Sequence, residues 1–153
     1  MDIIIRPVME TDYDRLSDIM DQVQKLHAEW RPDVYKDVSP LISREYFAEI
    51  LKGDSWYAAE ADGVVAGILE LTGRHVENPS HVTKNILYID TMAVDENYRG
   101  KGIGHKFFEM INQLKKEKGF DSIELQVNAK NVRAYEMYKK CGFTEKSINM
   151  ELL

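Results

Sequence analysis

The chain has 153 residues, of which 44% are hydrophobic and 30% charged, and its formal net charge is −6. We expect a chain of this length to fold as a single domain over residues 1–153, burying roughly 70% of its unfolded surface. An acidic chain lacks the basic footprint of a general nucleic-acid-binding protein, and no apolar run approaches the ~20 residues that cross a bilayer. Neither nucleic acid nor membrane is therefore expected as a partner, and the acidity is compatible with a cationic small substrate.

The N-terminal residues and the lone cysteine indicate a compartment. The stretch "MDIIIRPVME" holds three isoleucines between Asp2 and Arg6. That run is too short and too charged for a signal peptide and is typical of a first strand. Cys141 has no partner for an internal disulfide, which fits a reducing environment. We expect a cytoplasmic protein.

The first third of the chain predicts one strand and two helices. Ile3–Ile5 has the composition of a strand. Thr11 is expected to cap a helix whose apolar residues recur at helical spacing. These residues are Leu16, Ile19, Met20, Val23 and Leu26. The stretch "HAEWRPDVYKDVSP" is expected to be irregular, and Ser43 can cap a second helix with Phe47, Ile50 and Leu51 on one face.

A hairpin and a third strong strand follow. The stretch "SWYAAEADGVVAGILELT" is typical of two strands joined at Asp62-Gly63. The stretch "GRHVENPSHVTKN" is expected to be a polar loop, and Ile86–Val94 a strand. The spacing of His75, Glu77 and His81 in that loop matches no standard metal site, so no metal is expected.

The second half alternates helices and strands. A helix with an apolar stripe should follow residue 102 and end at Gly119, and "SIELQVN" should form a strand. The stripe consists of Ile103, Phe107, Met110, Ile111 and Leu114. Asn128 or Asn131 should open a shorter helix through Lys140, Gly142 should cap its end, and Phe143 should begin a last strand. The fold class expected is α/β (α+β), with a mixed central sheet flanked by helices.

The segment "NYRGKGIG" places Gly100, Gly102 and Gly104 at alternate positions beside Arg99 and Lys101. Glycine allows a backbone to approach a ligand closely, and the two cations suit an anion. The segment lies between a strand and a helix whose first amides lack partners, which favours a phosphate site. A dinucleotide fingerprint would need a further glycine two residues later, and no Gly-Lys-Ser or Gly-Lys-Thr occurs. A tight strand-to-helix turn without a ligand is the alternative.

Two segments together carry a family resemblance. "YIDTMAVDENYRGKGIG" followed by "NAKNVRAYEMYKKCGF" resembles the GNAT superfamily of acyl-CoA-dependent N-acetyltransferases. The family's central pattern is Arg or Gln, two residues, Gly, one residue, and Gly or Ala, which Arg99, Gly102 and Gly104 satisfy. The order of elements agrees over essentially the whole chain, and the motifs cover about 87–143. The resemblance implies a GNAT-like sheet with a splayed strand pair at the coenzyme site.

The resemblance implies acetyl-CoA as cosubstrate. The backbone amides of the loop would wrap its pyrophosphate, and the residues concerned are Arg99, Gly100, Lys101, Gly102, Ile103 and Gly104. The strand ending in Met92, Ala93 and Val94 would carry a bulge and bind the pantetheine arm through its backbone, with the Met92 N–H as oxyanion donor. An ordinary core strand is the alternative. Asn131 and Ala134 match the family's coenzyme-contacting asparagine and small residue.

Acetyl transfer needs an acid for the departing thiolate and a base for the amine, whose ammonium form has a pKa near ~10.4. Tyr138 lies seven positions after Asn131, two turns along the same helical face, and matches the family's acid tyrosine. A tyrosine that only packs is the alternative, and Tyr135 lies off that face. Asp90 and Glu70 are the candidate bases, because both could face the cleft from adjacent strands. Members of the family often use such a carboxylate or only a water chain.

The acceptor is expected between the first two helices and the loop after the second main strand. Glu29, Trp30 and Tyr35 are candidate substrate residues, because carboxylates beside aromatic rings suit a cationic amine. Arg31 and Arg74 in the same segments leave an acceptor with a carboxylate open.

We interpret the chain as an N-acetyltransferase that acts on a primary amine of a small polar acceptor by direct transfer in a ternary complex. Three alternatives remain: an acyl-CoA-binding regulatory domain without turnover, an acetyltransferase for a protein or peptide amine, and a nucleotide-binding module. A homodimer is consistent with the family.

Overall fold

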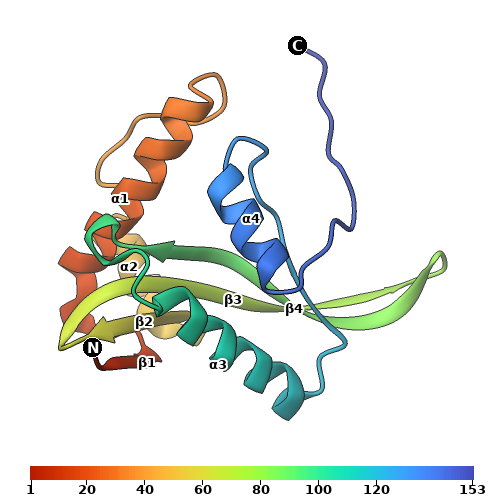
Figure 1. Cartoon of the computed structure of the whole chain (residues 1–153), viewed down its shortest axis with the longest axis horizontal. Helices are drawn as coiled ribbons and strands as arrows, with labels where there is room; N and C mark the ends of the chain where they lie inside the picture. The colour runs from red at the N-terminus through yellow and green to blue at the C-terminus, as the bar shows by residue number, and fades with distance from the viewer.

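A five-stranded sheet with the order β1-β2-β3-β4-β5 runs through the computed structural model, which describes all residues 1–153 (Figure 1). Neighbouring strands are antiparallel from β1 to β4, and β5 is parallel to β4. This confirms the expected mixed sheet. In chain order the elements are β1 (Ile3–Pro7), α1 (Tyr13–Trp30), α2 (Arg44–Lys52), β2 (Trp56–Ala61), β3 (Val64–Asn78), β4 (His81–Val94), α3 (Ile103–Lys118), β5 (Ser122–Leu125) and α4 (Val132–Lys140).

The two faces of the sheet bury separate cores, because successive side chains of a strand point to opposite faces. On one face, Ile68 of β3 packs with residues of α1 and α2, among them Leu16 and Phe47. On the other, Leu69 packs with residues of α3, among them Phe107 and Ile111. Figure 1 accordingly shows α1 and α3 on opposite sides of the sheet.

Gly67 of β3 brings α3 close to the sheet. A Cβ atom at this position would lie 2.8 Å from Ile103 and 3.0 Å from Phe107, closer than packed atoms allow. The absence of a side chain therefore sets the height at which the first turns of α3 rest on β3.

Local start and stop signals are mostly confirmed. Ser43 caps α2 by accepting a hydrogen bond of 3.1 Å from the Tyr46 N–H, and Asn131, rather than Asn128, caps α4 through the Ala134 N–H. The Asp62-Gly63 hairpin is present, with positive φ at both residues. Gly119 ends α3 in the left-handed conformation. None of the helices combines the length and apolarity that crossing a membrane requires.

The expected start and end of the first helix are wrong. Thr11 lies inside a 3₁₀ turn over Glu10–Asp12 and caps nothing, whereas the Asp12 carboxylate accepts a hydrogen bond of 2.8 Å from the Met9 N–H. Asp12 is fixed there by Arg6 of β1, whose guanidinium donates to both carboxylate oxygens at 2.7 and 2.9 Å. The helix also runs through Trp30, so the first four residues of "HAEWRPDVYKDVSP" are helical.

The expected polar loop over 73–85 is wrong as well. β3 continues to Asn78 and β4 begins at His81, so the two strands form a long antiparallel arm that projects from the body (Figure 1). Cross-strand contacts hold the arm, such as the 2.7 Å bond between His75 Nδ1 and Asn85 Oδ1. Both faces of the arm are largely exposed to water, so its sequence lacks the apolar alternation of a half-buried strand.

The last predicted strand is absent. Phe143 packs with Phe108 and Tyr138, with ring centroids 5.7 Å apart in both pairs, but no residue from 144 to 153 joins the sheet. This segment leaves the end of α4 as an extended chain (Figure 1). The sequence after Phe143 has the pattern of a strand, but this segment pairs with no strand although the outer edge of β5 is free.

Candidate functional site

β4 and β5 separate partway along β4, at one edge of the sheet. They pair only from Ile86↔Ser122 to Ile89↔Leu125, after which β4 continues to Val94 with β3 as its single neighbour. An extra residue, Asp90, stands between the pairs Leu71↔Ile89 and Glu70↔Thr91, so β4 carries a bulge where the separation begins. The backbone of residues 90–94 therefore has one edge without a strand partner. It includes Met92, Ala93 and Val94.

The glycine loop follows directly. Gly100 has a φ of +73° and Gly102, the N-cap of α3, a φ of +91°, and a Cβ at either position would meet no atom within 4 Å. These two positions thus require glycine for their conformation and leave open space beside the backbone. Arg99 and Lys101 are exposed and form no ion pair, and Ile103 begins α3 in the core. The free first-turn amides of α3 add the positive end of a helix dipole.

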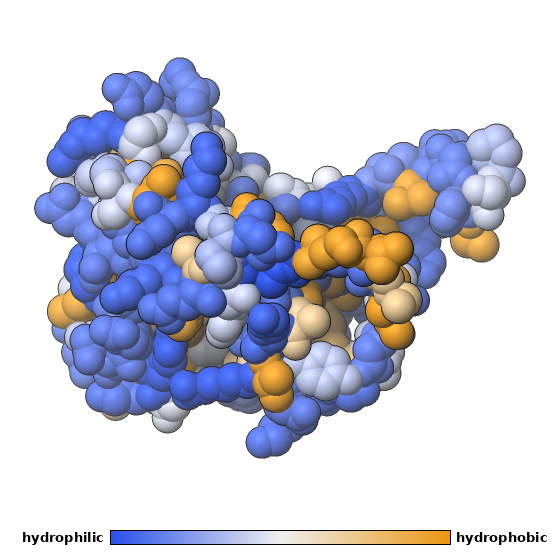
Figure 2. Space-filling view, turned by 90° about the horizontal axis from the view of Figure 1, so that it is seen from above, coloured by the Kyte–Doolittle hydropathy of each residue, from blue (hydrophilic) through white to orange (hydrophobic).

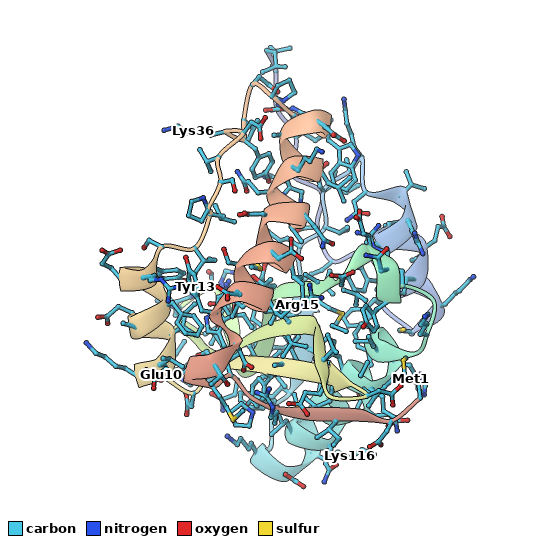
Figure 3. All side chains as sticks on the ribbon, turned by 90° about the vertical axis from the view of Figure 1, so that its left-hand side faces the viewer. Met1, Glu10, Tyr13, Arg15, Lys36 and Lys116 are labelled. Atoms are coloured by element: carbon cyan, nitrogen blue, oxygen red, sulfur yellow. The ribbon has the colours of Figure 1, made fainter.

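A buried carboxylate fixes the start of this loop. Asp95 is 2% exposed and accepts hydrogen bonds from Arg15 at 2.7 Å, the Asn97 N–H at 2.8 Å and Gln22 at 3.2 Å. Burial would raise the pKa of Asp95, but these donors outweigh burial and hold the pKa below its usual value. Arg15 and Gln22 belong to α1, and Figure 3 labels Arg15 near the beginning of that helix. The loop is therefore tied to α1.

α4 lies beside the first turn of α3. A Cβ at Gly104 would be 3.7 Å from the sulfur of Met137, an ordinary packing distance, so residue 104 and Met137 of α4 are neighbours. The ring of Tyr138 meets that of Phe108 edge to face, with centroids 6.1 Å apart. Burial raises the pKa of Tyr138 above its usual value, so the phenol stays protonated at neutral pH. Asn131 and the half-buried Ala134 lie on the same helix, where Asn131 accepts the Ala134 N–H.

The two candidate bases share one face of the sheet. Asp90 accepts hydrogen bonds from Thr72 at 2.6 Å and Arg74 at 3.0 Å, so its oxygens are engaged. Glu70 accepts only the Thr91 hydroxyl, at 3.2 Å. Burial, with the charge of Asp90, raises the pKa of Glu70 above its usual value. Burial, with the charges of Glu70 and Asp90, raises the pKa of Tyr46 of α2 above its usual value.

The three candidate substrate residues lie at the C-terminal end of α1 and just beyond it. Trp30 and Tyr35 both stack on His27, with ring centroids 5.6 and 4.8 Å apart. Glu29 is exposed and forms no hydrogen bond or ion pair. Tyr35 also lines a hollow of about 2060 Å³ together with Tyr88, Tyr138 and β5. Of the three, only Tyr35 borders this hollow.

Sequence reasoning missed Asp95, its partner Arg15 and the position of Tyr46. Asp95 carries one local signal, because its side chain accepts the Asn97 N–H as an N-cap of the 3₁₀ turn over Glu96–Tyr98. The contact of Arg15 with Asp95 joins segments 80 residues apart and has no local signal, and neither has the position of Tyr46.

Comparison with known proteins agrees with this geometry. The model of the acetyltransferase (GNAT) family matches residues 20–143. An uncharacterized N-acetyltransferase of Methanocaldococcus jannaschii is 29% identical over 108 residues, which are 69% of this chain and 47% of that protein. The chain spans about half the length of the curated relatives it matches, with shares of 47%, 31% and 61% for three of them.

Solved structures resemble the whole fold. A mutant of a Bacillus halodurans protein has a TM-score of 0.87 and 27% identity, with 98% of each chain covered. An aminoglycoside N-acetyltransferase solved with CoA has a TM-score of 0.72 and 16% identity, covering 99% of this chain and 94% of its own. The same enzyme has been solved with a bisubstrate analogue of CoA and acetylneamine. With its family match, its splayed strands and its glycine turn, the chain belongs to the GNAT acetyltransferase family.

Proposed function

We propose that the protein transfers the acetyl group of acetyl-CoA to a primary amine of a small, polar, cationic acceptor, by direct transfer in a ternary complex. The observation that carries this proposal is the opening of β4 from β5 immediately before the glycine turn. The unpaired backbone of 90–94 can bond to the amide-rich pantetheine arm as an added strand would. The amides of 99–104, beside Arg99 and Lys101, can hold the pyrophosphate.

The chemistry follows from bringing both reactants together in one cleft. The neutral amine attacks the thioester carbonyl carbon, the carbonyl oxygen becomes negative, and the C–S bond breaks as the carbonyl re-forms. The Met92 N–H is the proposed donor to the oxygen, and the Tyr138 hydroxyl gives its proton to the departing thiolate. A phenol held protonated by burial suits this role.

Glu70 is our choice as the base that removes the proton of the amine. It is half-buried, its pKa is raised, and a single hydroxyl bonds it, so one oxygen can accept a proton directly or through water. Asp90 is the weaker candidate for the base, because both of its carboxylate oxygens accept hydrogen bonds, from Thr72 and Arg74. Glu70 forms no ion pair, so its carboxylate is free to attract an ammonium.

The preference for a cationic acceptor rests on which charges are left free. Arg74 forms an ion pair with Asp90 at 3.0 Å, and its guanidinium carbon lies 3.4 Å from the centroid of the Tyr88 ring. Arg31 forms an ion pair with Asp33 at 2.8 Å. Both arginines that could have bound an acceptor carboxylate are thus engaged. Glu29 and Glu70 form no ion pair, and Trp30, Tyr35 and Tyr46 offer aromatic faces for a cation.

The test is the release of free CoA thiol from acetyl-CoA with a panel of amines: polyamines, aminoglycosides, neutral monoamines, amino acids and short peptides. We expect the polycationic small amines to give the highest kcat/KM. Fastest release with peptides would favour a peptide amine as acceptor. Binding of acetyl-CoA with no amine-dependent release would favour a regulatory domain without turnover.

We also propose that the protein is cytoplasmic. Cys141 is an exposed free thiol, which persists in the reducing environment of the cytoplasm.

A further inference from the structure

The side chain of Arg74 lies in a small site that three other side chains form. Its guanidinium lies 3.0 Å from one carboxylate oxygen of Asp90, and its guanidinium carbon lies 3.4 Å from the centroid of the Tyr88 ring. The other Asp90 oxygen accepts a hydrogen bond from the Thr72 hydroxyl at 2.6 Å. A carboxylate beside an aromatic face is a combination that binds organic cations in water. Thr72, Tyr88 and Asp90, here called the cradle, therefore form a cation site, and a cation of the chain itself fills it.

The cradle is fixed in the sheet, whereas the side chain that fills it is not. Thr72 and Tyr88 are paired residues of β3 and β4, and Asp90 is the bulge residue of β4. Arg74 stands where the exposed arm begins, and its side chain is 49% exposed, against 23% for Asp90. Figure 2 shows the arm as a mostly hydrophilic projection from the body, so a displaced guanidinium can turn into water. Because an exposed ion pair contributes little to folding, the cradle can exchange Arg74 for another cation while the sheet stays intact.

The cradle borders the hollow that the proposed acid also lines. Arg74 and Tyr88 line the hollow of about 2060 Å³ together with Tyr138. Asp90 comes two residues before Met92, whose N–H is the proposed donor to the acetyl oxygen. Two residues of a strand span about 7 Å, so the cradle lies a short chain's length from the amine that is acetylated. One small molecule can therefore place one amino group at the thioester and a second in the cradle.

We propose that the cradle binds a second cationic group of the acceptor, and that this group displaces Arg74. The inference rests on the proposed acetyl transfer and narrows the acceptor to a molecule with two cationic groups a short chain apart, such as a diamine. Arg74 keeps Asp90 paired while no acceptor is bound, and it competes with each incoming second cation for the same carboxylate and ring. An acceptor with a single amino group does not use the cradle and leaves Arg74 in place. Arg74 is thus a specificity residue that lowers the affinity for diamines.

The experiment compares cadaverine with pentylamine, which has the same carbon chain and only one amino group. The readout is the ratio of their kcat/KM values in thiol release at saturating acetyl-CoA, because a loss common to both amines cancels in this ratio. Arg74→Ala should raise the ratio about tenfold, because the competitor for the cradle is gone. Asp90→Asn should lower the ratio by a similar factor, because the charge that holds the second cation is lost. Lys84 is an exposed residue of the same arm, so Lys84→Ala removes an equal charge outside the cradle and should leave the ratio unchanged.

A binding measurement separates the cradle from the transfer reaction. Calorimetry of cadaverine in the presence of CoA, which has no acetyl group to transfer, should show tighter binding to Arg74→Ala than to the parent protein. Pentylamine should bind the two proteins alike. Tighter binding of cadaverine without any thiol release from acetyl-CoA would refute the proposed function and support the cradle.

Four results would overturn the proposal. An unchanged ratio in Arg74→Ala would mean that Arg74 only joins β3 to β4. An equal rise in Lys84→Ala would mean that net charge, and not the cradle, sets the preference. An unchanged ratio in Asp90→Asn, with both rates reduced, would mean that Asp90 acts as the base. Slower release with an amino acid as acceptor in Arg74→Ala alone would mean that Arg74 binds an acceptor carboxylate. Asp90→Asn tests the cradle even if Arg74→Ala folds poorly.

Discussion

Two tyrosines three residues apart on α4 differ in what surrounds their hydroxyls. Tyr135 is tied to the carboxylate of Glu145, which raises its pKa. Tyr138 is packed between Phe108 and Phe143, burial raises its pKa, and its hydroxyl bonds to no other protein group. A phenol that is protonated and uncommitted can give its proton to a ligand, so the two residues are a natural test and control.

We expect Tyr138→Phe to lower kcat by roughly 10²-fold or more, because the ring still packs while the proton for the thiolate is lost. The affinity for acetyl-CoA should change little. Tyr135→Phe on the same helix should keep near-normal turnover. Steady-state rates with a fast acceptor, and a pre-steady-state check that chemistry limits kcat, measure this. Unchanged turnover in Tyr138→Phe under those conditions would mean that the residue only packs.

At the scale of elements, the turn between β4 and α3 is held from three directions. The Asp95 N–H donates to Ala66 O of β3 at 2.8 Å, and the Asp95 carboxylate is bound by α1. Gly67 lets α3 rest on β3. The amides that the turn presents are therefore fixed before any ligand arrives, which lowers the entropy lost on binding.

Gly102→Val should abolish the rise in melting temperature that acetyl-CoA gives the parent protein by mass action. Valine is strained at a φ of +91°, and its side chain occupies the open space that the pyrophosphate is proposed to fill. Gly63→Val is the matched control, because Gly63 has a φ of +84° and equally open surroundings in the β2–β3 turn. Both variants should melt lower than the parent, but Gly63→Val should keep its ligand-induced shift. A normal shift in Gly102→Val would refute the pyrophosphate assignment.

Asp95→Asn should lower the free energy of unfolding at pH 7 by about 1–3 kcal/mol, because Arg15 loses a charged partner at a buried site. The native pKa of Asp95 is below its unfolded value, so its contribution is complete above the unfolded pKa and is lost as pH falls through the native pKa. The variant and parent should therefore converge in acid. Urea unfolding of the parent and the variant between pH 3 and 7 measures the difference in their free energies of unfolding. This range is chosen because the pKa of an ordinary aspartate lies near ~3.9.

Asp18→Asn provides the control for that change. Asp18 bonds to the same Arg15 at 3.0 Å, but its side chain is 55% exposed. An exposed pair of this kind contributes about 0–1 kcal/mol. Equal losses in the two variants would mean that Asp95 has no special role in holding the turn.

The whole molecule carries 26 acidic and 20 basic residues. A net negative field attracts cations over distances of a Debye length and repels anions. An anionic cosubstrate at the proposed site would bind against the average field, with the local help of Arg99 and Lys101, whereas the proposed cationic acceptor would be attracted by it.

At saturating acetyl-CoA, kcat/KM for a dicationic amine should fall about tenfold between low and high ionic strength, because screening removes this attraction. A monoamine bearing a compensating carboxylate should change far less. Glu29→Gln and Trp30→Ala should each reduce the rate with the dication, and Glu29→Gln should also reduce the dependence on salt. Higher turnover of neutral or acidic amines at low salt would contradict a cationic acceptor.

The sequence predicted what depends on local chemistry. The turn at Asp62-Gly63, the caps at Ser43 and Asn131 and the left-handed Gly119 are set within a few residues of chain, and each is present. Thr11 was the wrong cap because Arg6, on another strand, fixes Asp12 instead. The arm of β3 and β4 escaped prediction because strands exposed on both faces need no apolar alternation. The strand expected from Phe143 is absent because alternation of apolar and polar residues shows which side chains share a face. It does not show whether another strand lies alongside.

The same division applies to the candidate site. Gly100 and Gly102 were predicted from their spacing beside Arg99 and Lys101 and from the family resemblance, and their positive φ angles give a conformational reason for glycine at both positions. The link from Asp95 to Arg15 joins residues 80 positions apart, and the charges of Glu70 and Asp90, on two strands, raise the pKa of Tyr46 on α2. Such contacts exist only once the layers are packed, so no short pattern in the chain announces them.

The short pairing of β5 has a consequence for how the chain folds. β2, β3 and β4 are successive antiparallel strands joined by tight turns. In contrast, Ile86 of β4 pairs with Ser122 of β5, and the whole of α3 lies between these residues in the sequence. Closing this larger loop costs more conformational entropy and so slows folding, and only four residue pairs stabilise the closed form. β5 should thus dock late during folding and detach early during unfolding. A ligand bound between the diverging ends of β4 and β5 would therefore hold together the strand pair that has the fewest residue pairs in the sheet.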